Sequence, residues 1–133
     1  MSTLTQLQIG DVLDEIQLDA VSRMDLIKYS GASGDFNPIH TIDDEAIKAG
    51  LPGIIAHGMW TMGNLAKIFT PHFEAGFIED YSIRFKGMVF LNDVITLRAT
   101  LKGVGNNTLC FQVQAVNQHG KDVLKGEVVY HLY

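Results

Sequence analysis

A short polar segment of the sequence carries a carboxylate and an imidazole five residues apart, at Asp35 and His40. Asn37 and Pro38 lie between them, and the proline ring fixes its own φ while pushing the preceding residue toward an extended backbone. Two such groups on a rigid turn can converge on one small molecule, such as a water. One can then take a proton while the other gives one, which is general acid–base chemistry.

An ordinary turn explains the same residues. Asp and Asn side chains commonly hydrogen-bond the backbone two residues further on, and Gly and Pro are frequent in turns. In this interpretation Asp35 or Asn37 caps the backbone and His40 bonds to a carbonyl group. The residue types alone leave both interpretations open.

A second candidate segment is His57 followed by Gly58, immediately before an apolar stretch that is predicted to be helical. Backbone N–H groups in the first turn of a helix have no partner inside the helix and lie at the positive end of its dipole. They can therefore polarise a carbonyl or hold an oxyanion, and Gly58 would let a substrate come close. Alternatively, the two residues simply begin a buried helix.

A metal site is the main rival explanation for the histidines. Asp35, His40 and His57 are the residue types of a two-histidine, one-carboxylate ligand set. They come from two separate segments, however, and lack the close spacing of a helical pair of histidine ligands. We therefore expect no bound metal. Cys110 is expected to be a structural thiol, because it falls in a regular strand pattern without a neighbouring base.

The elements that position these residues begin with helices. Three are expected, at residues 23–29, 43–49 and 58–69. Ser22 is a candidate N-cap for the first helix, with Asp25 in the capping-box position, and Gly31 and Gly34 would end it. The third has apolar residues around most of its circumference, as in a helix buried inside a sheet, and Pro71 would stop it.

Strands follow the helices. From about residue 81 apolar residues alternate with polar ones, which predicts half-buried antiparallel strands. The expected strands are 12–18, 81–86, 95–101, 109–115 and 128–132, the last four in a meander, with hairpin turns at 103–107 and 117–120. This order predicts an α+β domain in which the sheet and the apolar helix bury each other.

Composition limits the classes of function. The 133 residues predict one domain, spanning 1–133, and the 47% of hydrophobic against 19% of charged residues favours a compact globular chain. A net charge of −5 without a Lys/Arg cluster in the sequence argues against nucleic acid or a membrane surface as the main partner. The single Cys110 excludes an internal disulfide. No signal peptide or spanning segment is evident, so we expect a cytoplasmic protein.

Residues 29–40, with Ala46 six positions later, resemble the hydratase motif of the MaoC-like dehydratases. This family includes (R)-specific enoyl-CoA hydratases and 3-hydroxyacyl-thioester dehydratases. Residues 57–59 and the expected strand at 81–85 match the family as well. The resemblance runs roughly from Gly10 to the end of the chain.

The resemblance implies a hot-dog fold, in which an antiparallel sheet wraps around a long central helix, in a protein that is usually dimeric. It implies that Asp35 and His40 bind the catalytic water and move protons in the reversible hydration of trans-2-enoyl thioesters of CoA or acyl carrier protein to (R)-3-hydroxyacyl thioesters. The N–H of Gly58 would polarise the thioester carbonyl. Asn37 and His57 would help to bind the substrate, and no cofactor is implied.

Two positions depart from the family pattern. Ala32 stands where a larger aliphatic residue or glycine is usual, and Gly63 stands where some family hydratases have a serine near the catalytic Asp. Gly63 lacks the supporting hydroxyl of that serine. We expect this difference to change the reaction rate and the substrate preference, but not the type of reaction.

Three alternatives belong to the same fold. A hot-dog thioesterase would carry its base elsewhere, often on the central helix, which has no Asp or Glu here. A non-catalytic acyl-binding subunit would have lost one of the pair Asp35 and His40. Residues 56–63 also resemble the catalytic subunit of heterodimeric 3-hydroxyacyl-ACP dehydratases. A homodimer or higher homo-oligomer and a heterodimer with a second hot-dog subunit therefore both stay open.

Overall fold

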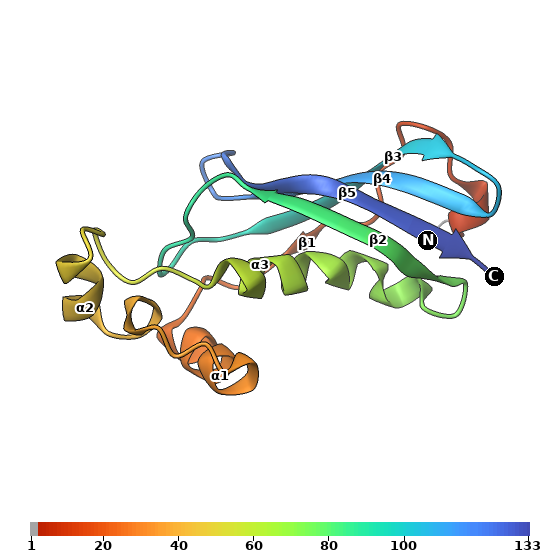
Figure 1. Ribbon diagram of the computed structural model, residues 1–133. Helices are drawn as coiled ribbons and strands as arrows, with labels where there is room; N and C mark the ends of the chain where they lie inside the picture. Colours follow the sequence, from red (N-terminus) through yellow and green to blue (C-terminus); the bar gives the residue numbers. More distant parts are fainter. Residues whose placement is uncertain (1–2) are drawn as a thin grey trace.

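A computed structural model describes residues 3–133 as an antiparallel sheet with a helix packed along one face (Figure 1). The α+β class expected from the sequence is confirmed. Within the described residues, every helix is too short or too polar to cross a membrane. The elements in chain order are a 3-10 helix at Leu4–Gln6, β1 (Ile16–Gln17), α1 (Arg23–Ser33), a 3-10 helix at Pro38–His40, α2 (Asp43–Lys48), α3 (Gly58–Leu65), a 3-10 helix at Ala66–His72, β2 (Gly76–Phe85), β3 (Thr96–Val104), β4 (Thr108–Val116) and β5 (Asp122–Leu132).

The strand order across the sheet is β1–β3–β4–β5–β2. Only β3, β4 and β5 form a meander, while β2 pairs antiparallel with β5 at one edge of the sheet. The expectation that β2 continues the meander into β3 is therefore wrong. The connection over residues 86–95 is long enough to lead the chain past the end of the sheet to the opposite side (Figure 1).

β1 is much shorter than the strand expected over residues 12–18. Only Ile16–Gln17 form a ladder with β3, and Val12 makes an isolated bridge to Thr100. The two acidic residues 14 and 15 lie between these contacts. Asp and Glu are poor strand formers, which accounts for the interruption.

The inward face of the sheet follows the expected alternation. β2 and β5 nevertheless begin earlier than expected, because glycine and charged residues at their starts obscured the period-two pattern. The hairpin turn at residues 117–120 is confirmed by the Gly120 N–H donating to the Asn117 carbonyl. The buried inward residues of the meander are Leu97, Ala99, Leu101, Leu109, Phe111, Val113, Ala115, Leu124, Val128 and Tyr130.

The first helix, α1, has the expected N-terminal cap. The Asp25 N–H donates to Ser22 Oγ at 3.1 Å, and the Ser22 N–H donates to Asp25 Oδ2 at 3.0 Å. The helix passes through Gly31 and ends only at Gly34, whose φ of 77° is left-handed. The expected stop at Gly31 is wrong because an interior glycine weakens a helix without breaking it.

The apolar helix, α3, ends at Leu65 and continues as a 3-10 helix that contains Pro71. The expected single helix over residues 58–69, stopped by the proline, is therefore wrong in its second half. The expectation that this helix is buried on all sides is also wrong for this chain. Thr61 and Leu65 are buried, but Met59 is 56% exposed. The face of α3 that carries Met59 is left without cover.

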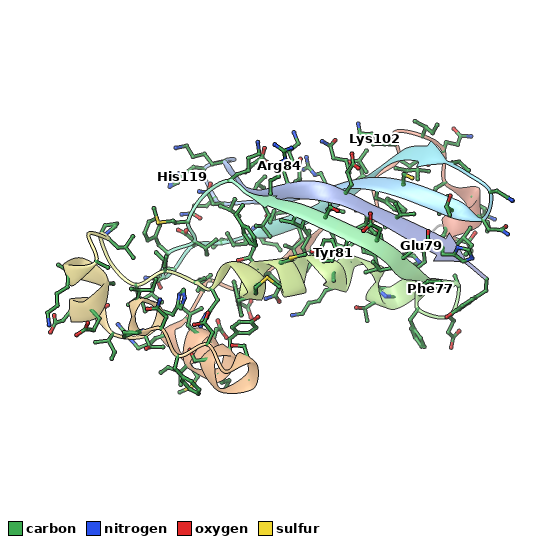
Figure 2. The ribbon with its side chains drawn as sticks, viewed as in Figure 1. Phe77, Glu79, Tyr81, Arg84, Lys102 and His119 are labelled. Atoms are coloured by element: carbon green, nitrogen blue, oxygen red, sulfur yellow. The ribbon has the colours of Figure 1, made fainter. Side chains whose placement is uncertain are left out.

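Tyr81 joins α3 to the sheet. Its hydroxyl, on β2, donates to the Met62 carbonyl of α3 at 2.5 Å, and Figure 2 shows the side chain directed toward the helix. Burial raises the pKa of Tyr81, so the group stays a neutral donor at physiological pH. This hydrogen bond fixes the position of the edge strand β2 relative to the helix α3.

Gly126 tests the pairing of β2 with β5. A Cβ at this position would clash with the backbone carbonyl oxygen of Ser82 and lie 2.9 Å from Ile83 Cδ1. We expect Gly126→Ala to lower the free energy of unfolding by about 2 kcal/mol or more, measured by urea titration, because the backbone must move. Gly63→Ala is the control. A Cβ there would meet no atom within 4 Å, so stability should stay or rise by up to about 1 kcal/mol. Equal stabilities would contradict the pairing.

Candidate active site

Asp35 lies on a tight turn between α1 and the 3-10 helix Pro38–His40. The Asp35 N–H donates to Ser33 Oγ at 3.1 Å, and Asp35 Oδ1 accepts the Asn37 N–H at 3.2 Å. Asn37 Oδ1 in turn accepts the Ile39 N–H at 3.2 Å and caps the 3-10 helix. The turn interpretation is therefore correct for the backbone, and these bonds leave Asp35 Oδ2 directed toward His40.

His40 is held by one ring nitrogen and presents the other. Its Nδ1 lies 2.7 Å from the Ile55 carbonyl oxygen. A carbonyl can only accept, so Nδ1 carries the proton and the neutral ring has its lone pair on Nε2. This Nε2 lies 3.9 Å from Asp35 Oδ2. The separation is too long for a direct hydrogen bond and suits a bridging water.

The ring of His57 lies beneath that of His40, with centroids 3.8 Å apart and planes 22° from parallel. His57 Nε2 lies 3.2 Å from the Asp35 carbonyl oxygen and 3.1 Å from Ser30 Oγ. Because the carbonyl needs a donor, Nε2 carries the proton. The buried Nδ1 has no hydrogen-bond partner among the described residues, which fits a neutral ring.

Burial is the main reason why the pKa of His57 is lowered. A charge on His40 lowers it further, while the Asp35 carbonyl and carboxylate act in the opposite direction. The ring is thus neutral at physiological pH and can pack against His40 without repulsion. Asp35 is different, since its side chain is 52% exposed and its carboxylate faces solvent as well as His40.

Gly58 begins α3 directly after His57. A Cβ on Gly58 would lie 2.7 Å from Phe85 Cε1, so any larger residue here would have to displace the aromatic ring of β2. That reason was missing from the sequence argument, which considered only the approach of a substrate. Beside Gly58 lies a small cavity of about 190 Å³, lined largely by apolar side chains that include Phe85, Met88 and Val123. Thr61 supplies a hydroxyl-bearing residue at the same cavity.

The structure brings together three of the five residues that the sequence singled out. Ligand-type atoms of Asp35, His40 and His57 lie within 4.8 Å of one another. Each imidazole donates one ring N–H to a backbone carbonyl, which fixes the orientation of both rings and leaves His40 Nε2 directed toward Asp35. Gly58 adjoins this cluster, whereas Asn37 is exposed and its side-chain oxygen caps the backbone.

Sequence reasoning missed several residues that support the site. Ser30 contacts His57 from α1, and Tyr29 packs edge-on against the same ring at a centroid distance of 4.8 Å. Both lie inside the motif at residues 29–40, so their place in it was the available signal. Phe85 and Ile55 reach the site from distant segments, and no local pattern identifies them.

The fold is that of the hot-dog proteins. R-hydratase PhaJ1 from Pseudomonas aeruginosa superposes with a TM-score of 0.86 over 96% of this chain and 83% of that chain, at 23% identity. A chain of the ChsH1–ChsH2 complex from Mycobacterium tuberculosis gives a TM-score of 0.85 over 95% and 98%, at 20% identity. The hot-dog fold expected from the resemblance is confirmed.

Within that fold the chain belongs to the MaoC-like dehydratase family, because residues 5–123 match the model of the MaoC like domain. A mitochondrial 3-hydroxyacyl-[acyl-carrier-protein] dehydratase from Arabidopsis thaliana is 32% identical over 95 residues, which cover 71% of this chain and 56% of that protein. The chain thus spans little more than half of this relative. The expected cytoplasmic location of the chain stays a prediction.

The lowered pKa of His57 predicts how stability depends on pH. The ordinary pKa of about 6.5 applies in the unfolded chain, so at pH values between the lowered folded pKa and 6.5 the unfolded chain binds more protons than the folded one. The contribution of His57 to the free energy of unfolding is therefore complete above pH 6.5 and is lost as the pH falls below that value. We expect the free energy of unfolding to decrease from pH 7 to pH 5, and to decrease less in His57→Gln. The pKa of His72 is also lowered by burial, so His72→Gln measures that second contribution. Identical pH dependence in wild type and His57→Gln would contradict a neutral His57.

Proposed function

We propose that the chain is a hydro-lyase that reversibly hydrates trans-2-enoyl thioesters and dehydrates (R)-3-hydroxyacyl thioesters. The observation that carries the proposal is the 3.9 Å separation of Asp35 Oδ2 and His40 Nε2. Both atoms are acceptors, so a water between them can donate one proton to each and direct its oxygen lone pair at a substrate carbon. The family membership and the name of the Arabidopsis dehydratase support this reaction class.

The proposed hydration adds the water oxygen to the β-carbon of the enoyl group. The proton that the pair Asp35 and His40 takes from this water is returned to the α-carbon, so the enzyme ends in its starting protonation state. Loss of water from the hydroxyacyl substrate is the same sequence in reverse. Because Nδ1–H donates to the Ile55 carbonyl, the neutral His40 ring presents the lone pair of Nε2 to the water and can accept its proton during hydration.

Negative charge on the thioester oxygen would be stabilised at the start of α3. During addition the charge of the enolate-like transition state collects on this oxygen. The Gly58 N–H lies in the first turn of α3, where N–H groups lack helical partners and the helix dipole is positive. The adjoining cavity of about 190 Å³ is mostly apolar and would take the acyl chain.

The wild-type chain is expected to hydrate crotonyl-CoA to the 3R product. We expect Asp35→Asn and His40→Gln each to lower kcat by at least about 100-fold, because each removes a proton acceptor from the water site. Asp35→Asn should also keep the wild-type unfolding midpoint, since the amide oxygen of the substituted side chain can still accept the Asn37 N–H. Asp44→Asn, which changes an exposed carboxylate in α2, is the matched control and should keep wild-type turnover. Near-normal turnover in Asp35→Asn would rule out the proposed mechanism.

We also propose that the chain forms a homodimer through β2. This strand pairs with β5 on one side and with no other strand among residues 3–133. Phe77, Phe85 and Met88, on or just after β2, are 45–57% exposed. An open strand edge with exposed apolar residues is a template for pairing with another chain. The ChsH1–ChsH2 structure, a complex of two proteins, supports association within this fold.

Light scattering tests this association. A homodimer is expected to show twice the 14.7 kDa mass of the chain at micromolar concentration. A constant 14.7 kDa species at all concentrations would contradict self-association and leave a second hot-dog subunit as the partner. The dimer would also cover the exposed side of Phe85 beside Gly58.

A further inference from the structure

Four cationic side chains gather on the face of the sheet that lies opposite α3. An open groove of about 830 Å³ crosses β2, β5, β4 and β3 and is lined by Arg84, Lys86, Lys102 and Lys125. Figure 2 shows Arg84 and Lys102 on this side of the sheet, away from the helix. The chain has only 10 Lys and Arg and a net charge of −5, so this groove is an exception to its overall charge.

None of the four groove cations forms a salt bridge with a carboxylate among residues 3–133. Arg84 of β2 is directly opposite Lys125 of β5 in the sheet register. Like charges directly opposite each other destabilise an antiparallel pair. Among residues 3–133, the Lys and Arg residues that pair with a carboxylate are Arg23, Lys48 and Arg98, none of which lines the groove. An anionic partner from outside the chain would relieve this repulsion.

The spread of the charges indicates the size of that partner. β5 and β4 separate Arg84 on β2 from Lys102 on β3, so their backbones are roughly 14 Å apart across the sheet at ~4.8 Å per strand. Glu127 lies between them and is the only carboxylate among residues 3–133 that lines the groove. A single phosphate cannot reach all four cations and would meet Glu127 at the centre. A protein surface with several spaced carboxylates can contact the cations and avoid Glu127.

The groove and the catalytic cavity lie on opposite sides of the end of β2. Arg84 and Lys86 line the groove, while Phe85 between them contacts the Gly58 position and lines the cavity. Residues 87 and 88 then pass along the cavity. A flexible thioester arm that rounds the end of β2 would therefore lead from a partner in the groove to Gly58.

We propose that this groove docks the acidic surface of a carrier protein that presents the acyl group as a thioester. The inference rests on the proposed function, because it names the form in which the substrate arrives. The carrier is recognised by Arg84, Lys86, Lys102 and Lys125, whereas the acyl group is recognised at Gly58 and the adjoining cavity. A CoA thioester has phosphate groups but no protein surface that could span the whole groove.

The test compares crotonyl-carrier protein with crotonyl-CoA. In Arg84→Gln/Lys125→Gln the ratio of kcat/KM for the carrier substrate to kcat/KM for the CoA substrate is expected to fall about tenfold, through KM and most strongly at low salt. Lys28→Gln/Lys67→Gln removes two exposed cations outside the groove and should keep the wild-type ratio. The charge-preserving variant Arg84→Lys/Lys125→Arg should retain most of the preference.

An unchanged ratio in Arg84→Gln/Lys125→Gln would overturn the proposal. This includes an equal loss with both substrates, which would indicate damage to the catalytic site. The proposal would likewise be overturned if the double variant changed only in oligomeric mass, because the groove would then be a contact between copies of the chain. If the wild type hydrates neither substrate, the proposed function fails, and docking is measured separately by fluorescence anisotropy of holo-carrier protein without an acyl chain. Equal affinity of wild type and the double variant for that probe would then overturn the docking.

Discussion

The buried ring of His57 contacts each of the segments that form the candidate active site. It contacts Ser30 of α1, the backbone of Asp35 on the following turn and the ring of His40, and it immediately precedes α3. With His57 uncharged, His40 can take up a proton at a centroid distance of 3.8 Å without repulsion from a second cation. Burial provides that condition by lowering the pKa of His57. The site therefore depends on the packing of α1 and α3 around one neutral imidazole.

Strand β2 contributes side chains both to the candidate active site and to the cationic groove on the opposite face of the sheet. Side chains of a strand alternate between its sides, so Phe85 packs toward Gly58 while its neighbours Arg84 and Lys86 line the opposite groove. Tyr81 on the same strand binds the carbonyl of Met62 and keeps β2 in register with α3. The proposed chemistry and the proposed docking of a carrier would therefore take place on opposite faces of the same sheet. The free edge of β2 is the surface that we propose for a second subunit.

Local patterns predicted much of the fold. The capping box at Ser22, the left-handed Gly34 and the alternation in β3 and β4 all depend on interactions between residues that are close in sequence. The position of β2 beside β5 depends instead on contacts between distant segments. An edge strand shows the same alternation of apolar and polar residues whichever strand it pairs with, so the sequence pattern does not identify its neighbour. The 3-10 helix through Pro71 also escaped the pattern, since apolar spacing alone does not distinguish it from continued α-helix.

The sequence by itself determined the pair Asp35 and His40, the rigid turn between them and the family to which they belong. These properties lie within a dozen residues, where residue type and backbone restriction are sufficient. Only the tertiary structure decided that His57 is stacked and neutral, that Phe85 closes on Gly58, and that distant cations share one groove. Those facts depend on which faces of separate elements meet and on how much water they exclude. Burial and sheet register, which set pKa values and charge clusters, are properties of the folded chain.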